Sequence, residues 1–306
     1  MKKRILVTGA GGFIGGNFIR RLAEDSTHEI HAVTLGQGLA DVASVNWISC
    51  PLIDLDRNYT NLFAPGFDCV YHLAAFTPAT GAMANLFLEN YQSNIAGTFS
   101  LLRLLQGKTR KFIFASTLDV YKNGCTLPMD ENSPTAPSTF YGQTKLFGEK
   151  MVSTYCQTNG IDFSILRIGH VYGPGEEKYG KIIPVLLRNS IEGNTTTITG
   201  DGSAKRDFIF ISDVCKILEE FSNINWSVPV NISAGRQISI REAAETINQV
   251  TCGQTNVVYT GDATNAHSVY FDNSLLVSLL DPGFVFTRFE EGISREFEYL
   301  KEIIQS

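Results

Sequence analysis

The stretch R-I-L-V-T-G-A-G-G-F-I-G, residues 4–15, decides the fold class of this 306-residue chain. A short apolar run passes into a glycine-rich turn, and a segment of helical period follows. A strand, a glycine loop and a helix in this order point backbone N–H groups and the positive helix end at a pyrophosphate, and glycine is favoured because a Cβ would hold the phosphates away. The spacing G-x-x-G-x-x-G, through Gly9, Gly12 and Gly15, is not the commonest dinucleotide fingerprint, so a purely structural turn stays open.

Outward from this stretch, short β-branched runs alternate with longer segments of helical period. The helical segments follow Phe13, Asn85 and Thr139. We expect strands at residues 4–8, 29–34, 68–73, 111–116 and 162–168. The alternation predicts an α/β fold, a Rossmann-type doubly wound parallel sheet with helices on both faces.

The pattern changes after about residue 171, where a Gly- and Pro-rich segment leads into shorter mixed elements. We therefore expect residues 1–170 to form an NAD(P)-binding Rossmann domain and residues 171–306 mainly to form a smaller C-terminal substrate-binding lobe. A segment near 205–235 is expected to return to the first domain, because residues 228–232 are another strand candidate.

The amino-acid composition argues against several classes of protein. A net charge of -6 and a pI near 5.4 argue against a nucleic-acid partner, because gripping a phosphate backbone needs a basic face. The six cysteines form no C-x-x-C pair and no metal-type spacing with the five histidines, so we expect free thiols and no metal. Glycines interrupt the first apolar run, and no run of about 18 apolar residues occurs. We therefore expect a cytoplasmic protein with no signal peptide and no membrane partner.

The end of the second expected strand bears on the cofactor. An acid there would mark NAD by binding the ribose hydroxyls, but residues 33–36, V-T-L-G, contain none, and Glu29 lies at the opposite end. The cofactor is thus NADP(H) or NAD(H). The neutral strand end favours NADP(H), although the arginine expected for its extra phosphate is also missing.

A phenol and an ammonium farther along the chain can act as a unit. Tyr141 and Lys145 are four residues apart in an expected helix and share a face. An adjacent cation lowers the pKa of an acid by about 1 to 3 units, which would bring the phenol into range for proton transfer. Thr117 ends an upstream strand and could hold the reacting oxygen, because strand ends face the ligand crevice. By spacing alone, a solvated helical pair is the alternative.

Several motifs, in order along almost the whole chain, resemble those of the extended short-chain dehydrogenase/reductase family of nucleotide-sugar epimerases, dehydratases and 4-keto-sugar reductases. They are T-G-A-G-G-F-I-G at 8–15, H-L-A-A at 72–75, N-I-A-G-T at 94–98, S-T-L-D-V-Y at 116–121 and Y-G-Q-T-K at 141–145. The resemblance implies that Thr117, Tyr141 and Lys145 are catalytic. It implies that the cofactor is bound by Gly9, Gly12, Phe13, Ile14, Gly15, Thr34, Leu73, Ala74, Ala75, Asn94, Tyr141 and Lys145.

Two further motifs concern the substrate, a nucleotide-sugar by the same resemblance. Y-G-P-G at 172–175 and G-D-G-S-A-K-R-D-F at 200–208 are similar to the family's, which implies that Arg206 holds a diphosphate through charge-assisted hydrogen bonds. A surface arginine paired with an acid of the same motif is the alternative. His170 stands where the family commonly has asparagine and either contacts the substrate or packs, and Thr117 is expected to contact the substrate as well.

Departures from the family pattern separate the reactions. Dehydratases carry an acid directly after the catalytic threonine, and here that residue is Leu118, so dehydration is disfavoured. The neutral strand end and H-V-Y-G-P-G at 170–175 resemble 4-keto-sugar reductases such as CDP-abequose synthase. We expect a reductase of a 4-keto group on a nucleotide-linked deoxysugar, with a 4-epimerase that holds NAD tightly as the alternative. A non-catalytic dinucleotide sensor would not need the proton-transfer set. The family also implies a homodimer through the segments after Asn85 and Thr139.

Overall fold

Two units make up the chain in a computed structural model that describes residues 2–77, 86–253, 255–262 and 267–305. The first unit comprises Met1–Cys125, Ser133–Ile168 and Cys215–Val230. The second comprises Thr126–Asn132, Gly169–Val214 and Asn231–Ser306.

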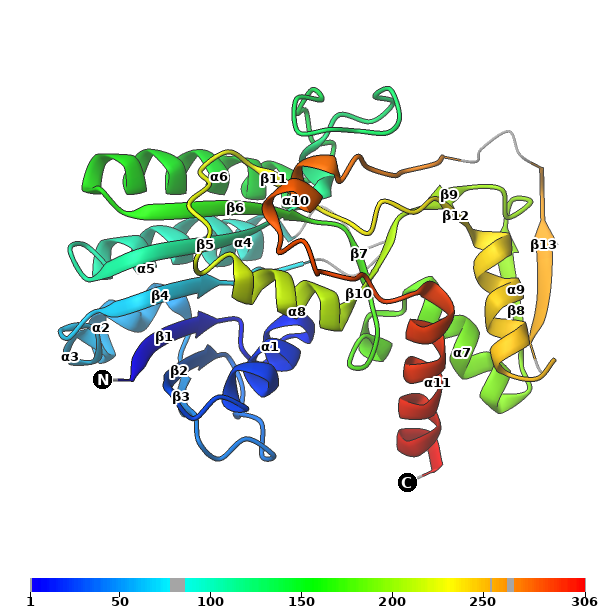
Figure 1. Ribbon diagram of the computed structural model, residues 1–306, viewed down its shortest axis with the longest axis horizontal. Coiled ribbons are helices and arrows are strands. Elements are labelled where there is room, and N and C mark those ends of the chain that lie inside the picture. Colours follow the sequence, from blue (N-terminus) through cyan, green and yellow to red (C-terminus); the bar gives the residue numbers. More distant parts are fainter. Residues whose placement is uncertain (1, 78–85, 254, 263–266, 306) are drawn as a thin grey trace. The chain divides into compact units, whose positions relative to one another are not determined.

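A parallel sheet of seven strands forms the centre of the first unit. The strands are β1 (Lys3–Thr8), β2 (His28–Thr34), β3 (Asn46–Ser49), β4 (Phe67–His72), β5 (Thr109–Thr117), β6 (Asp162–Ile168) and β11 (Val230–Ile232), which starts at the last residue of this unit. They stand in the order β11-β6-β5-β4-β1-β2-β3, and every pairing from β3 to β6 is parallel (Figure 1). The strand order reverses between β1 and β4, and in such sheets ligands bind at that point, outside the carboxyl ends of the strands.

Helices cover both faces of this sheet. They are α1 (Phe13–Ala23), α2 (Leu55–Asn58), α3 (Thr60–Phe63), α4 (Phe87–Asn90), α5 (Gly97–Leu104) and α6 (Phe140–Asn159), with short turns η1 (Leu52–Asp54) and η4 (Leu118–Val120) and a π-helix η3 (Tyr91–Ala96). Side chains alternate between the two faces of a strand. In β4, Val70 joins the cluster that packs with α5, whereas Tyr71 meets the ring of Phe18 in α1 at 4.6 Å. The doubly wound α/β fold expected from the sequence is therefore confirmed.

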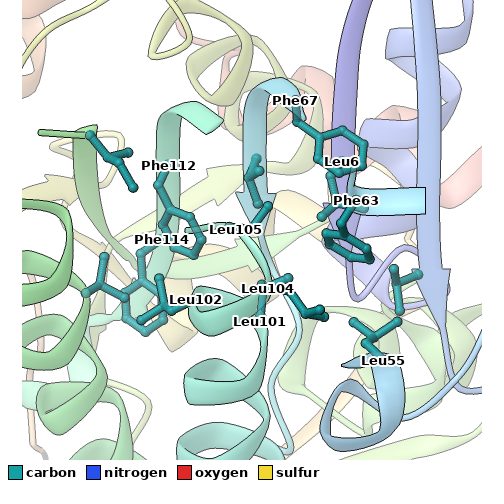
Figure 2. Packing of buried hydrophobic residues seen from close by; sticks show 14 of the residues in the cluster. Leu6, Leu55, Phe63, Phe67, Leu101, Leu102, Leu104, Leu105, Phe112 and Phe114 are labelled. Carbon is teal, nitrogen blue, oxygen red and sulfur yellow. The ribbon is translucent and has the colours of Figure 1, made fainter. Parts of the chain in front are cut away.

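The core on one face is formed by leucines of α5 and of its C-cap, which lie between aromatic rings. Figure 2 shows Leu101, Leu102 and Leu105 between the rings of β5 and the ring of Phe63 in α3. These side chains are at most 1% exposed, and full burial of one such side chain stabilises a fold by about 1.5–3 kcal/mol. The parallel pairing of the two strands places His72, at the end of β4, opposite Phe114 of β5.

Two details of the first unit differ from the expectations. The sequence did not predict β3, because Ile48 is the one buried residue of its four and no alternation is visible. The single helix expected after Asn85 is instead α4, the π-helix η3 and α5 in succession. Within the described part of the chain, no helix combines the length and the apolar character that a membrane span requires.

The second unit contains three two-stranded sheets and several helices. The sheets pair β7 (His170–Tyr172) with β10 (Phe208–Phe210), β9 (Lys205–Arg206) with β12 (Ile238–Ser239), and β8 (Thr195–Thr199) with β13 (Asn256–Thr260). The helices are α7 (Ile182–Glu192), α9 (Ile240–Val250), α10 (Ser274–Leu279) and α11 (Phe289–Gln305), with a turn η5 (Glu177–Tyr179), and α8 (Ile211–Glu220) continues into the first unit. The rings of Tyr172, Phe208, Phe210 and Phe289 pack together at centroid distances of 5.3–6.2 Å.

Two buried carboxyl groups lie near this aromatic cluster. Glu176 and Glu296 are each 1% exposed, and each has one oxygen without a hydrogen-bond partner among the described residues. Burial raises the pKa of Glu176 to about 7, although an ion pair with Lys181 at 2.9 Å lowers it. Burial also raises the pKa of Glu296, and the charge of Glu176 adds to this effect. The folded chain therefore holds protons that the unfolded chain would release.

We expect Glu176→Gln to stabilise the protein at alkaline pH. The raised pKa means that the contribution of Glu176 to stability is complete below its ordinary value near 4.5 and is lost as the pH rises through about 7. A glutamine has no proton to lose, so at pH 8 the free energy of unfolding should exceed that of the wild type by about 1 to 3 kcal/mol, and at pH 4.5 the two should agree. Thermal melts at both values measure the difference. An equal effect at both would contradict the assignment.

Candidate active site

The glycine loop joins β1 to α1 at the carboxyl edge of the sheet. Gly9 has a φ of +71°, a left-handed conformation that favours glycine, and the N–H of Gly12 donates to its carbonyl at 2.9 Å. α1 starts at Phe13, and among the described residues no side chain caps it and no acid stands in its first turn. The first N–H groups and the positive end of this helix are thus suited to an anion such as a pyrophosphate.

Packing within the chain is a second reason why two of these positions require glycine. A Cβ on Gly15 would lie 2.1 Å from the carbonyl oxygen of Gly9, and a Cβ on Gly9 would lie 2.6 Å from the backbone nitrogen of Ala74. The reason expected from the sequence, room for phosphates, is therefore incomplete. The loop itself closes only with glycine at these positions.

The end of β2 lies against the same loop. Thr34 is buried, its hydroxyl accepts the N–H of Gly36 at 3.3 Å, and a Cβ on Gly11 would approach that hydroxyl to 2.4 Å. Of the two apolar residues after the loop, Phe13 is packed in the core and Ile14 is partly exposed. Ile14 is therefore the most exposed of these three expected cofactor contacts.

A directed chain of hydrogen bonds passes through His72 at the end of β4. The hydroxyl of Thr98 donates to the carbonyl of Asn94 at 2.7 Å, so it accepts from Nε2 of His72, also at 2.7 Å. Nδ1 is then an acceptor and receives the hydroxyl proton of Thr8 at 2.7 Å, and Thr8 accepts the N–H of Ala74 at 3.3 Å. Burial lowers the pKa of His72 to about 3, so the ring is neutral. This chain ties β1 and β4 to η3.

Asn94 uses its amide within the protein. Its Oδ1 accepts the N–H of Phe76 at 2.7 Å, and its Nδ2 donates to the carbonyl of Phe76 at 3.1 Å and to the hydroxyl of Thr144 at 3.0 Å. The residue expected to bind the cofactor thus fixes the backbone that follows β4 to helix α6. The residues of that backbone with an expected cofactor contact are Leu73, Ala74 and Ala75.

Helix α6 starts and ends where its sequence supplies caps. The hydroxyl of Thr139 accepts the N–H of Gly142 at 3.1 Å, and Gly160 closes the helix with a φ of +64°. Tyr141 and Lys145 therefore stand one turn apart near its start. Lys145 is buried.

The three expected catalytic residues come together at the ends of α6 and β5. Nζ of Lys145 lies 4.2 Å from the ring centroid of Phe114 in β5, and the side chain of Thr117, which ends that strand, lies near enough to Tyr141 to affect its pKa. The hydroxyl of Thr117 also accepts the N–H of Asp119 at 3.2 Å. This arrangement can hold an oxygen atom of a ligand between a hydroxyl and a phenol.

The pKa values of this group differ from the expectation. Burial raises the pKa of Tyr141 to about 12, with a smaller contribution from the charge of Asp119, although hydrogen bonds with Thr77 and Thr117 lower it. Burial lowers the pKa of Lys145 to about 7, although a neighbouring carboxylate raises it. The expected lowering of the phenol pKa by Lys145 is wrong within the chain, because both charged forms lose hydration in one buried place.

The second unit holds the two other expected substrate residues. Nη1 of Arg206 donates to the carbonyls of Lys205 at 2.9 Å and His267 at 2.5 Å. The carboxylate of Asp207 accepts the N–H groups of residues 234 and 235, and Asp201 accepts from Ser203. In the described ranges, both acids of the motif therefore bind other donors than Arg206.

His170 has a neutral ring close to Arg206. Burial lowers the pKa of His170 to about 4, and the charges of Arg206 and Lys181 act in the same direction. Its Nδ1 is buried and has no hydrogen-bond partner among the described residues. His170 can therefore accept a hydrogen bond at neutral pH.

Three buried charges of the first unit were not predicted, Lys111, Glu149 and Arg167. For Glu149 and Arg167 the sequence contained a signal that could have identified them. Glu149 follows Lys145 at the interval that separates Lys145 from Tyr141, and Arg167 interrupts the apolar end of β6.

Comparison with known proteins places this site in a family. Residues 5–221 match the NAD dependent epimerase/dehydratase family. The uncharacterized UDP-glucose epimerase YtcB of Bacillus subtilis is 30% identical over 99% of this chain and 99% of its own. The UDP-N-acetyl-alpha-D-glucosaminuronate decarboxylase of Bacillus cytotoxicus is 31% identical over 85% of this chain and 84% of its own. The structure of UDP-glucuronic acid 4-epimerase from Bacillus cereus, in complex with UDP-glucuronic acid and NAD, has a TM-score of 0.85 at 25% identity and covers 98% of this chain and 99% of that one.

These relatives bear on the expected reaction. They are named as epimerases and a decarboxylase, which favours the 4-epimerase alternative over the 4-keto-sugar reductase. The preference for NADP(H) likewise finds no support, since the solved relative contains NAD. The match spans most of the chain and includes every expected catalytic residue. The chain belongs to the NAD dependent epimerase/dehydratase family.

Proposed function

We propose that this chain is an NAD-dependent nucleotide-sugar 4-epimerase. The observation that carries the proposal is the meeting of Thr117, Tyr141 and Lys145 at the carboxyl edge of the sheet, in the same unit as the glycine loop. A 4-keto reductase would use the same residues. The relatives named as epimerases favour the epimerase over the reductase.

We infer that the first unit holds NAD. The uncapped start of α1 and the glycine loop would bind its pyrophosphate. Thr34 would contact its adenosine half, and Lys145 would bind a ribose hydroxyl. When bound, NAD⁺ supplies the hydride acceptor and a positively charged ring.

Tyr141 would exchange the proton of the sugar hydroxyl. At neutral pH the buried phenol keeps its proton, which suits the return of a proton to a 4-keto oxygen. Removing a proton from the hydroxyl requires the phenolate, so a positive charge near the ring must offset burial in that half of the reaction. Thr117, which lies near Tyr141, would hold the sugar oxygen.

The second unit would bind the nucleotide-sugar. Arg206 and the neutral ring of His170 lie close together there, and a guanidinium binds phosphate oxygens through paired hydrogen bonds. We propose that Arg206 contacts the diphosphate and that His170 accepts a hydrogen bond from the substrate.

The test incubates the purified protein with NAD⁺ and UDP-glucose or UDP-glucuronic acid, and follows the sugar by NMR and the reduced cofactor by absorbance. Interconversion of the 4-epimers without net formation of NADH supports the proposal. Oxidation of NADH or NADPH in proportion to a 4-keto sugar would instead identify a reductase. Release of carbon dioxide from UDP-glucuronic acid would identify a decarboxylase.

An exposed apolar surface of the first unit supports a homodimer. Its members come from α4, η3, α5 and α6, which contact one another, and are 46–57% exposed. They are Phe87, Leu88, Tyr91, Phe99, Phe140 and Phe147. The rings of Phe87 and Phe140 lie 5.2 Å apart, so the surface is continuous between α4 and α6. A continuous apolar patch is typical of an interaction site, and a two-fold axis would pair it with itself.

We expect Phe147→Asp to dissociate this dimer. A carboxylate would have to be buried at the interface, so the dimer dissociation constant should rise at least about 30-fold, the equivalent of about 2 kcal/mol. Analytical ultracentrifugation measures the change. Val285→Asp is the control, because Val285 is 77% exposed in the second unit. A monomeric wild type, or a Phe147→Asp protein as dimeric as the control, would refute the interface.

A further inference from the structure

A buried ion pair stands one helical turn beyond Lys145. The side chains of Glu149 in α6 and Arg167 in β6 are 3% and 5% exposed. Nε of Arg167 donates to Oε1 of Glu149 at 2.9 Å, and Nη2 donates to Oε2 at 2.8 Å. A paired geometry of this kind fixes both the direction and the distance between two groups.

The pair connects the elements that carry the proposed catalytic residues. The hydroxyl of Ser116, next to Thr117 at the end of β5, donates to Oε1 of Glu149 at 2.6 Å. Nη1 of Arg167 donates to the hydroxyl of Tyr121, just after η4, at 3.0 Å, and the guanidinium lies 5.0 Å from the centroid of that ring. Glu149 therefore attaches the ends of β5 and β6 to the helix of Tyr141 and Lys145.

The carboxylate also acts on Lys145 through its charge. Burial lowers the pKa of Lys145, and Glu149 opposes that change. Around the ammonium, among the described residues, β4 contributes the neutral ring of His72 and β5 the ring of Phe114. An ammonium between a neutral imidazole and an aromatic ring depends on the one carboxylate on its own helix to remain charged.

We propose that Glu149, oriented by Arg167, is a positioning residue that keeps the Lys145 ammonium charged and holds Thr117 in place opposite Tyr141. The catalytic part of this inference rests on the proposed function, whereas the effect on Lys145 does not. Arg167 cannot supply this effect itself, because its own charge has the same sign as that of Lys145. Its part is to fix the carboxylate, and the pair of bonds to Glu149 in turn raises the pKa of Arg167.

The test is Glu149→Gln, which keeps the shape of the side chain and its acceptor for Ser116 but removes the charge. The titration of Lys145 is followed by NMR of protein labelled with ¹³Cε-lysine, with Lys145→Arg to assign the signal. We expect the proton affinity of Lys145 to fall at least tenfold, and the alkaline limb of the kcat profile to move to lower pH by the same factor. A purely structural role would lower kcat equally at every pH.

Three variants complete the design. Glu149→Asp keeps the charge but displaces it by about one methylene, so its Lys145 titration should lie between those of Glu149→Gln and the wild type. Ser116→Ala removes one bond to the carboxylate and leaves its charge, so the Lys145 titration should stay unchanged. Glu192→Gln removes an exposed acid from the second unit and controls for net charge.

The outcomes separate this inference from the proposed function. An unchanged titration in Glu149→Gln overturns the inference even if activity falls. Should Glu149→Gln fail to fold, Glu149→Asp decides, because the shorter side chain moves the charge away from Lys145 by about one methylene, and an unchanged Lys145 titration would then be the refuting result. A shifted titration in a protein that converts no nucleotide-sugar supports the inference and refutes the function.

Discussion

Replacing Tyr141 with Phe should lower kcat by about 10²- to 10⁴-fold, the usual contribution of a positioned proton donor. The phenol of Tyr141 lies near Thr117 and keeps its proton at neutral pH, so it is placed to give that proton to the reacting oxygen. The ring itself remains, so the dissociation constant for NAD⁺ should change less than threefold. Steady-state kinetics and calorimetric titration with NAD⁺ measure the two effects.

A second tyrosine on the same helix provides the matched control. The hydroxyl of Tyr155 has no hydrogen-bond partner among the described residues, so Tyr155→Phe removes a phenolic hydroxyl without breaking a bond. Its kcat should equal that of the wild type. A Tyr141→Phe protein that turned over like the Tyr155→Phe protein would show that another residue transfers the proton.

The second large effect is expected for Gly15→Ala in the glycine loop. The added Cβ would lie 2.1 Å from the Gly9 oxygen and 2.8 Å from its carbonyl carbon, both backbone atoms that a rotamer change cannot relieve. Overpacking of this kind destabilises a protein by about 1–3 kcal/mol. The displaced loop should also weaken NAD⁺ binding at least tenfold. Chemical denaturation and calorimetry test these two results.

The neighbouring glycine is the control for this variant. A Cβ on Gly16 would meet no heavy atom closer than 3.7 Å, an ordinary contact, although it stands in the same turn of α1. Alanine favours a helix over glycine by about 1 kcal/mol, so Gly16→Ala should be neutral or stabilising. If both variants bound NAD⁺ like the wild type, the loop would not be the pyrophosphate site.

Local patterns predict much of this molecule, and contacts between distant segments account for the rest. The strand at residues 162–168 has the expected bounds, and Thr117, Tyr141 and Lys145 could be identified because strand ends and four-residue helical spacing are readable in a sequence. The π-helix η3 could not be predicted, because its Asn94 forms hydrogen bonds with Phe76 and Thr144, which are 18 and 50 positions away.

For the charged residues of the site, too, local spacing predicts one part and contacts between distant segments determine the rest. That Tyr141 and Lys145 share a helix face follows from their spacing, but the direction of the Tyr141 pKa depends on how deeply the phenol is buried, which the spacing does not report. Arg167 could be seen as a charge in an apolar strand, yet its partner Glu149 lies 18 positions earlier on a helix. Pairings of this kind exist only in three dimensions.

The internal bonds of the glycine loop have a consequence for the thermodynamics of binding. The N–H of Gly12 is bonded to Gly9, and the N–H of Ala10 donates to the carbonyl of Val33 at 3.0 Å, so the protein's own backbone sets the loop conformation. Ordering the backbone of a flexible residue opposes association by about 1–2 kcal/mol. Because the loop is already ordered in the folded protein, binding a ligand costs little further backbone entropy. The binding free energy therefore reflects mainly the contacts that the ligand makes.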